Sequence, residues 1–353
     1  MKRFLLLFTN ELKLFRTTIP IHLVAIFQPA IMFLLMSSIL VHPTFDMYLQ
    51  QPSTAEGQAL AAAMAEVGSP IGQPYIRLHL VENRDPAQGQ RQVVSVEVRD
   101  GQPTAVQRFG LVDSNMVKNF RNRLTAAALQ VWDQALGAKA ITVIQRPWLP
   151  GDVSYLVYFG MAMLPLGAAM GASILGSILT AQEFEHGTIQ EARLSPIPAG
   201  LILAARLARV ALFGLLGAGG TLLALGVTTG HWPAVLWQSG LVLLAVAVLY
   251  GCIGVIAGLC FQRTIPAFLV ALVASMVGWL LGSAFGLANG FSAGYASLSQ
   301  LTPNTQAVAL LFPLFFGAQV SKPLTAGLVL AGMASALVLL AGASYRRQVL
   351  RQA

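Results

Sequence analysis

Acidic residues are scarce in this chain and very unevenly placed. Only 10% of its 353 residues are charged and 56% are hydrophobic, whereas roughly 25% are charged in an ordinary soluble domain. Of the fourteen Asp and Glu residues, Glu11 stands alone near the start, ten lie between positions 46 and 152, and three lie between 183 and 191. This composition excludes a soluble protein. No acidic residue follows Glu191, so any mechanism that needs an acidic side chain in the last 162 positions is also excluded.

The chain also lacks the features of a disulfide scaffold or a nucleic-acid-binding protein. Its two cysteines, Cys252 and Cys260, lie in one apolar run, about 12 Å apart on a helix, which is too far for a disulfide. The net charge is +8, yet residues 41–152 carry ten basic and ten acidic residues. The positive excess therefore lies beside apolar runs, and we expect no nucleic-acid partner.

Six apolar runs are long enough to cross a bilayer, which takes about 20 residues in a helix. They cover approximately 19–40, 153–180, 200–227, 234–260, 265–288 and 324–344. Basic residues flank these runs at both ends of the chain, which predicts that both termini lie in the cytosol. Residues 1–18 are apolar and basic and predict an amphipathic helix on the cytosolic surface. Residues 346–353 are expected to form a cytosolic tail.

A shorter apolar segment, 301–318, lies within the five-helix region 153–345. The continuous apolar part of this segment, AVALLFPLFFG, has about a dozen residues, which is too few to span a membrane. Counting it as a span would also move Arg346 and Arg347 to the side opposite Lys2, against the positive-inside bias. We therefore expect an interfacial or re-entrant segment on the outer side.

Residues 41–152 are predicted to form an extracytoplasmic α/β domain between the first two spans. Two helices are expected, one over about 53–67 and one of about twenty residues that begins after position 113 or 114. Three strands are expected over about 75–80, 94–98 and 140–144. Asp100-Gly101 is a hairpin signal after the second strand. The domain shows no metal-spaced His or Cys set. The expected fold class is a polytopic α-helical membrane protein with six transmembrane helices and this inserted domain.

Groups that could couple transport to an energy source are missing as well. An ion-driven carrier needs titratable groups inside its spans, and none of the expected spans contains an acid. His22 lies at the cytosolic edge of the first span, and Arg206 and Arg209 lie near the start of the third, where long side chains can snorkel. There is no GxxxxGK[ST] phosphate loop. Uphill transport would therefore take its energy from another polypeptide.

The cytosolic loop 181–198 contains the only acidic cluster outside residues 41–152. Gly187 can end the helix that continues from the second span, and Thr188 with Glu191 fits a capping box for a short helix. Ser195-Pro196 is a start signal for the third span. We expect a short helix that exposes acidic groups below the membrane; a solvated turn is the alternative reading.

This loop resembles the first cytosolic loop of ABC-2 type permease subunits, whose pattern is close to E-x-E-x-G-T-x-x-x-x-x-x-S-P. The positions that match are Glu183, Glu185, Gly187, Thr188, Ser195 and Pro196. Phe184 and His186 stand where family members often carry basic residues. The order of surface helix, span, external domain and five further spans is also similar to the subgroup with a large external domain.

The resemblance implies a non-catalytic permease subunit in the bacterial inner membrane, whose loop docks on a separate ATP-binding cassette ATPase that holds ATP and Mg. The expected coupling residues are Glu183, Glu185, His186, Gly187, Thr188, Glu191 and Arg193. No metal and no cofactor is expected on this chain. Membrane lipids are further partners, and a periplasmic adaptor is left open.

Glycines at helical spacing predict close helix packing. They are Gly167 and Gly171 in the second span and Gly278, Gly282 and Gly286 in the fifth. The resemblance implies that these helix faces contact a second permease copy or a paralogue, or that they line the path of the transported substrate. The expected function is outward export of a hydrophobic or amphiphilic substrate. The alternatives are a membrane scaffold or sensor with a ligand- or partner-binding external domain and, third, a secondary transporter.

Overall fold

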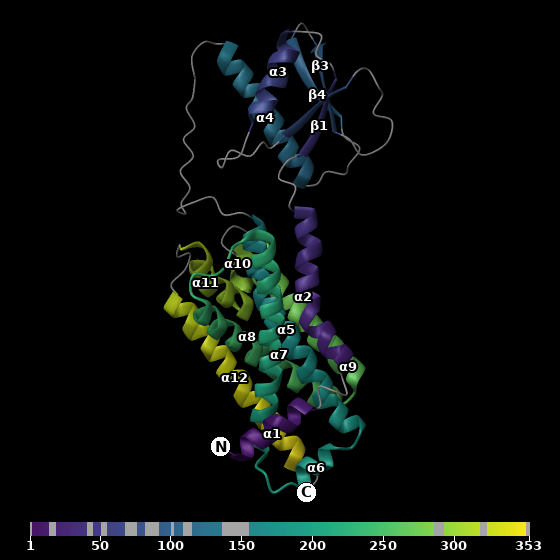
Figure 1. The fold of residues 1–353 in the computed structure, drawn as a ribbon, viewed down its shortest axis with the longest axis vertical. Helices are drawn as coiled ribbons and strands as arrows, with labels where there is room; N and C mark the ends of the chain where they lie inside the picture. Colours follow the sequence, from purple (N-terminus) through teal and green to yellow (C-terminus); the bar gives the residue numbers. More distant parts are fainter. Residues whose placement is uncertain are drawn as a thin grey trace. The chain divides into compact units, whose positions relative to one another are not determined.

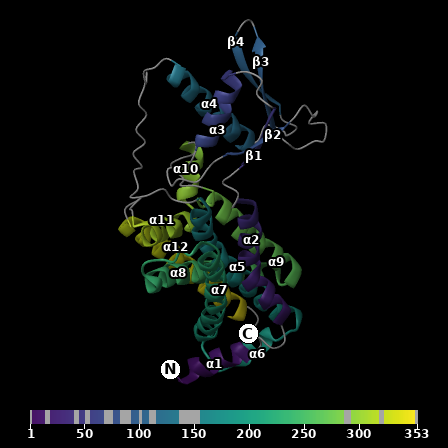
Figure 2. The ribbon, with the colours of Figure 1, turned by 45° about the horizontal axis from the view of Figure 1, so that its top comes forward.

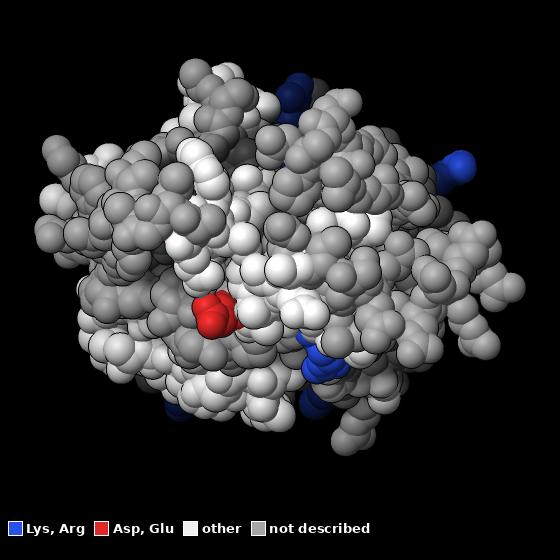
Figure 3. Space-filling view, turned by 90° about the horizontal axis from the view of Figure 1, so that it is seen from above, with Lys and Arg blue, Asp and Glu red and all other residues white. Residues whose placement is uncertain are grey.

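The computed structural model consists of two compact units, which are described separately. One unit comprises Met1–Ser38 with Val153–Ala353, and the other comprises Ile39–Asp152. The residues that the structure describes are 2–13, 19–40, 45–50, 55–67, 76–81, 92–99, 102–108, 115–135, 155–285, 293–317 and 323–350. Few of the described residues on the face that Figure 3 shows are charged.

The first unit is helical (Figure 1). Its helices are α1 (Lys2–Lys13), α2 (Ile19–Leu40), α5 (Tyr155–Glu185), α6 (Ile189–Leu194), α7 (Ala199–Thr229), α8 (Leu236–Phe261), α9 (Thr264–Leu281), α10 (Ala293–Gln300), α11 (Pro303–Phe316) and α12 (Pro323–Leu350). Six of the described helices, α2, α5, α7, α8, α9 and α12, are long and apolar enough to cross a membrane. The chain is therefore a multi-pass helical membrane protein, as predicted.

Two of the expected boundaries are wrong. The helix α9 ends at Leu281 rather than near 288, and Ser283 after it has a φ of 66°. At the other end of the chain, α12 continues to Leu350, past the expected end of the span near 344, so the first residues of the expected tail are helical. Arg347 lies in the last turn of α12, where a positive charge is favoured by the helix dipole.

Helix α5 forms the centre of the helical unit. Its most apolar 18-residue window is completely buried, whereas only 22% of the corresponding window of α9 and 17% of that of α12 are buried. The helix packs against α7, α8 and α9, which surround it in Figure 1. Because α5 has no free face in the described structure, its small residues serve contacts within the chain.

Glycines and backbone atoms make these contacts close. A Cβ on Gly171 of α5 would lie 2.8 Å from the Phe213 carbonyl oxygen of α7. On the other side of α5, a Cβ on Gly254 of α8 would lie 2.1 Å from the Ser173 carbonyl oxygen. Small residues at such positions let helix backbones approach each other.

Cys252 of α8 is buried, Cys260 is exposed, and both are free thiols.

The segment 301–318 contains α11, whose 14 residues are not among the membrane-spanning helices. Thr302 caps the helix by accepting a hydrogen bond from the Thr305 backbone N–H at 3.3 Å, and Pro303 occupies its first turn. Leu311 and Phe312 are buried, and α11 packs against α5, α8 and α12. The Ala234 N–H donates to the Leu314 carbonyl at 2.7 Å, so α11 lies at the α7–α8 connection, away from α6 (Figure 1).

The second unit has a four-stranded sheet in the order β2-β1-β3-β4. Its elements are β1 (Phe45–Gln50), α3 (Ala55–Glu66), β2 (Ile76–Val81), β3 (Gln92–Arg99), β4 (Gln102–Arg108) and α4 (Asn115–Ala135). Strand β1 is parallel to β2 and β3, whereas β3 and β4 are antiparallel. A parallel pair needs a crossover connection, which α3 supplies between β1 and β2. Strand β1 was not predicted, and the predicted strand 140–144 lies outside the described residues.

One face of this sheet is covered by α3 and α4, which lie side by side in Figures 1 and 2. The core between them contains Met47, Leu49, Ile76 and Val94 from the strands and Leu60, Met64, Leu124 and Ala127 from the helices. The Gln130 side-chain amide donates to the Glu66 carboxylate at 2.7 Å, which joins the two helices. Met47 and Leu49 alternate along β1, as burial of one sheet face requires, and Val94 of β3 is the partner of Leu49 in the sheet.

The tight α5–α8 contact leads to a stability prediction. Gly254→Ala should destabilise the protein by about 1–3 kcal/mol because the added methyl group overlaps the α5 backbone, and this lowers the midpoint of thermal unfolding in detergent. Gly240→Ala in the same helix is the matched control, because nothing lies within 4 Å of its Cβ position. Equal unfolding midpoints for the two variants would contradict the packing described here.

Candidate functional site

The connection between α5 and α7 contains the predicted short helix. Helix α5 ends at Glu185, and Gly187 has the left-handed φ of 71° that ends many helices. The His186 N–H donates to the Gln182 carbonyl at 2.9 Å and closes the last turn. Helix α6 then runs from Ile189 to Leu194 before α7 begins. A short helix between two breaks therefore forms where the sequence predicted it.

The predicted capping box at the start of α6 is wrong. The backbone of Thr188 is already helical, with φ −68° and ψ −13°, and its side chain makes no capping hydrogen bond. A capping side chain requires an extended backbone at that position. Instead, the N–H groups of Gln190 and Glu191 donate to the carbonyls of Gly187 and Thr188 at 3.1 and 3.0 Å. The tight turn itself thus satisfies the N–H groups of Gln190 and Glu191.

Glu183 does not project from the loop into solvent. Its carboxylate forms an ion pair with Arg206 of α7, and the Arg206 side chain is only 2% exposed. The Arg206 guanidinium also lies 5.3 Å from the centre of the Tyr345 ring of α12, a distance at which cation–π attraction operates. The expectation that Glu183 is exposed is therefore wrong, and so is the expectation that Arg206 snorkels. The ion pair holds α5 and α7 together inside the bundle.

Arg209, one turn further along α7, joins two more helices to the same region. Its guanidinium donates to the Glu11 carboxylate of α1 at 3.1 Å and lies 3.2 Å from His22 Nε2 of α2. Both His22 and Arg209 are fully buried, so Arg209 does not snorkel either. His22 packs edge-on against Phe213, with ring centres 4.6 Å apart. We call Glu11, His22, Glu183, Arg206 and Arg209 the ionic cluster.

Glu185, the second acid of the loop, binds the start of α9. Its carboxylate accepts hydrogen bonds from the Thr264 backbone N–H, at 2.8 Å, and from the Thr264 hydroxyl. A negative charge at the N-terminus of a helix satisfies free N–H groups and is favoured by the helix dipole. Glu185 therefore connects the end of α5 to α9 rather than standing free.

One side of α6 faces the bundle. Ile189 is 4% exposed and belongs to the core of the helical unit. Arg193 donates to the Gln348 carbonyl in the last turn of α12 at 3.3 Å, where helix carbonyls lack partners within the helix. Helix α6 is joined through the chain to α5 and α7, and Arg193 connects it to α12. Glu185 at the end of α5 adds a connection to α9.

The opposite side of α6 is open. His186, Gly187, Thr188, Gln190 and Glu191 are exposed, and Leu194 is 87% exposed. We call Gln190, Glu191 and Leu194 the exposed α6 face. This face therefore offers an apolar and an acidic side chain that a bound protein can contact.

The glycines predicted to mark helix contacts face the interior of this chain. A Cβ on Gly167 would lie 2.9 Å from the Gly217 carbonyl oxygen of α7. Gly278 faces the Tyr250 hydroxyl, and Gly282 faces Asn304. Gly286 lies outside the described residues. The described glycines therefore pack α5 and α9 against their neighbours, and a contact with a second copy stays a prediction.

Sequence reasoning missed the partners of Arg206 and Arg209. The signal for them was present, since two arginines three residues apart lie on one face of an otherwise apolar helix. Charged residues at such positions are usually paired. The described residues contain no group of His, Cys, Asp and Glu that could hold a metal ion.

The ion pair between Arg206 and Glu183 leads to a second stability prediction. Arg206→Met leaves the Glu183 carboxylate without its buried partner and should cost about 3–5 kcal/mol of stability. Removing both charges, in Glu183→Leu with Arg206→Met, should recover most of this loss. Thermal unfolding in detergent measures both effects, and Arg346→Met on the exposed surface of α12 is the control. Additive losses in the double variant would show that the two charges do not interact.

No family model matches the chain, and a search of curated proteins finds no match. What the site can do is therefore decided by its own residues. Among the described residues they include no set of His, Cys, Asp and Glu that could hold a metal ion. They form a short helix with one exposed side, connected to several membrane-spanning helices. Such an element can receive a push or a pull from a bound protein and pass it to the bundle.

Proposed function

We propose that this chain is the permease subunit of an ATP-driven exporter of the ABC-2 type, and that α6 docks on a separate ATPase subunit. One observation carries the proposal: α6 presents an exposed apolar and acidic side and joins α5 to α7, while its Arg193 contacts α12 and Glu185 at the end of α5 contacts α9. The loop pattern from Glu183 to Pro196 supports the same assignment, because it is similar to that of the ABC-2 family.

The contacts of the loop suggest how a movement of α6 reaches the spans. Glu183 transmits it to α7 through Arg206, Glu185 transmits it to α9 through Thr264, and Arg193 transmits it to α12. The Glu183–Arg206 ion pair is largely buried, where a low dielectric strengthens it. The Glu185 and Arg193 contacts lie nearer the surface. In this proposal, ATP and Mg are bound by the partner, which does the hydrolysis, and this chain performs no catalysis.

The proposed orientation places α6 and both termini in the cytosol of a bacterium with the chain in the inner membrane. The positive excess near the chain ends supports this orientation. The unit Ile39–Asp152 then forms an extracytoplasmic α/β domain, available to an adaptor. The charge-poor spans favour a hydrophobic or amphiphilic substrate.

A second permease copy would contact α9 rather than α5 in this proposal. The α5 window is completely buried within one chain, so it has no surface to offer. Helix α9 instead exposes apolar side chains at helical spacing, including Leu269, Val273, Val277 and Leu280. Gly278 of α9 faces Tyr250, and Gly282 directly after the helix faces Asn304.

Co-purification tests the docking role of α6. The full chain would be purified in mild detergent from its own cells, and the proteins bound to it identified by mass spectrometry. An ATP-binding cassette ATPase should bind the unaltered chain, and the double variant Glu191→Lys with Leu194→Glu should retain at most about a tenth of it, since loss of a contact centre costs 2 kcal/mol or more. Both side chains are exposed, so the variant should unfold at the same temperature as the unaltered protein.

Lys13→Glu is the matched control, because Lys13 is also exposed but lies on α1. It should leave ATPase binding unchanged. Absence of an ATPase from the unaltered chain would favour the scaffold or sensor. Transport in ATP-depleted vesicles that follows an imposed ion gradient would favour a secondary transporter.

A further inference from the structure

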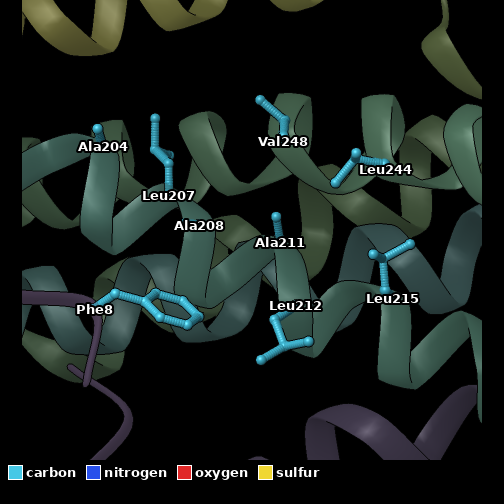
Figure 4. A pocket seen from close by; sticks show the side chains of 9 residues that line it. All are labelled: Phe8, Ala204, Leu207, Ala208, Ala211, Leu212, Leu215, Leu244 and Val248. Atoms are coloured by element: carbon cyan, nitrogen blue, oxygen red, sulfur yellow. The ribbon is translucent and has the colours of Figure 1, made fainter. Parts of the chain in front are cut away.

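An apolar groove of about 530 Å³ lies on the outside of the helical unit. Figure 4 shows the residues that line it, which come from α7, α8 and α1. Phe8 of α1 lies at the end of the groove near Ala204, and Leu215 and Leu244 lie at the other end (Figure 4). The described lining has no charged side chain. It therefore suits a hydrocarbon chain rather than a polar ligand.

Small residues of α7 create the hollow. Ala204, Ala208 and Ala211 follow one another at intervals of four and three residues, which places them on one face of the helix. Larger neighbours, Leu207 and Leu212, stand beside this row. A row of short side chains between long ones leaves a channel along the helix axis.

The length of the groove matches one leaflet of a bilayer. From Ala204 to Leu215 the helix rises about 16 Å, at 1.5 Å per residue, and the hydrocarbon core of a bilayer is about 30 Å thick. Ala204 also lies near the start of α7, which begins at Ala199. The groove therefore runs from the membrane edge on the α1 side to about the middle of the bilayer.

The helix at the Ala204 end of the groove, α1, carries a basic surface. Lys2, Arg3 and Lys13 of α1 are exposed, whereas its acid, Glu11, is paired with Arg209. A basic amphipathic helix at a membrane surface attracts anionic lipid headgroups. A symmetric contact with a second copy would instead bring two such basic helices together, which like charges oppose.

We propose that this groove binds one acyl chain of an anionic phospholipid from the leaflet on the α1 side, with the phosphate beside the basic residues of α1. The lipid would pack between α1 and the α7–α8 pair. Since Glu11 of α1 contacts Arg209 of α7, the bound lipid would favour the position of α1 in which the ionic cluster is complete. This inference does not depend on the proposed export function.

Native mass spectrometry of the full chain in detergent tests the site. The protein would be titrated with phosphatidylglycerol and with phosphatidylcholine of the same acyl chains. The first phosphatidylglycerol should bind more tightly than phosphatidylcholine. Lys2→Gln with Arg3→Gln should weaken it about fivefold for each charge removed and leave phosphatidylcholine unchanged. Ala208→Phe, which fills the groove, should weaken binding of the first lipid of either kind at least about tenfold.

Ala336→Phe is the matched control, because it adds the same ring on an exposed position of α12, and it should change neither affinity. If Ala208→Phe prevents folding, Ala204→Phe at the exposed end of the groove replaces it. Equal affinity for the two lipids, or unchanged binding after filling the groove, would overturn the proposal. A shift from dimer to monomer with unchanged lipid binding would assign the groove to a second copy instead.

Discussion

The burial of two arginines in α7 is the constraint on which the rest of the helical unit depends. A guanidinium inside an apolar bundle is costly unless it is paired and hydrogen-bonded. Arg206 finds Glu183 of α5 and the Tyr345 ring of α12, and Arg209 finds Glu11 of α1 and lies beside His22 of α2. The ionic cluster thus brings five helices together at the end of the bundle where α6 lies.

This arrangement separates structural acids from the surface that is free to bind a partner. Glu183 and Glu185 are engaged by Arg206 and Thr264, so reversing their charges would loosen the bundle as well as any coupling. The exposed α6 face carries the docking proposal instead. The same contacts attach the α5–α6 connection to α7, α9 and α12, so in the proposal a movement of α6 also moves these spans.

Much of the helical architecture follows from the sequence, because long apolar runs and glycine breaks are local signals. They predicted the six helices of the described residues that can cross a membrane, the break at Gly187, and that α11 is too short to be one of them. The side-chain partners could not be predicted in this way, since Glu11 and Arg209 are 198 residues apart. Nor did alternation reveal β1, which is recognisable only through its pairing with β2 and β3. Exposure of Glu183 was misjudged because local sequence does not show which helix covers a loop.

Site-specific photo-crosslinking from α6 tests the central claim most directly. A photoreactive amino acid at Gln190, on the exposed α6 face, would be activated in intact cells and the covalent adduct identified by mass spectrometry. The same group at Leu339, which is 74% exposed on α12, is the control and should label lipid. The account predicts an adduct between position 190 and an ATP-binding cassette ATPase. Adducts at 190 with lipid alone, or with proteins that bind no nucleotide, would contradict it.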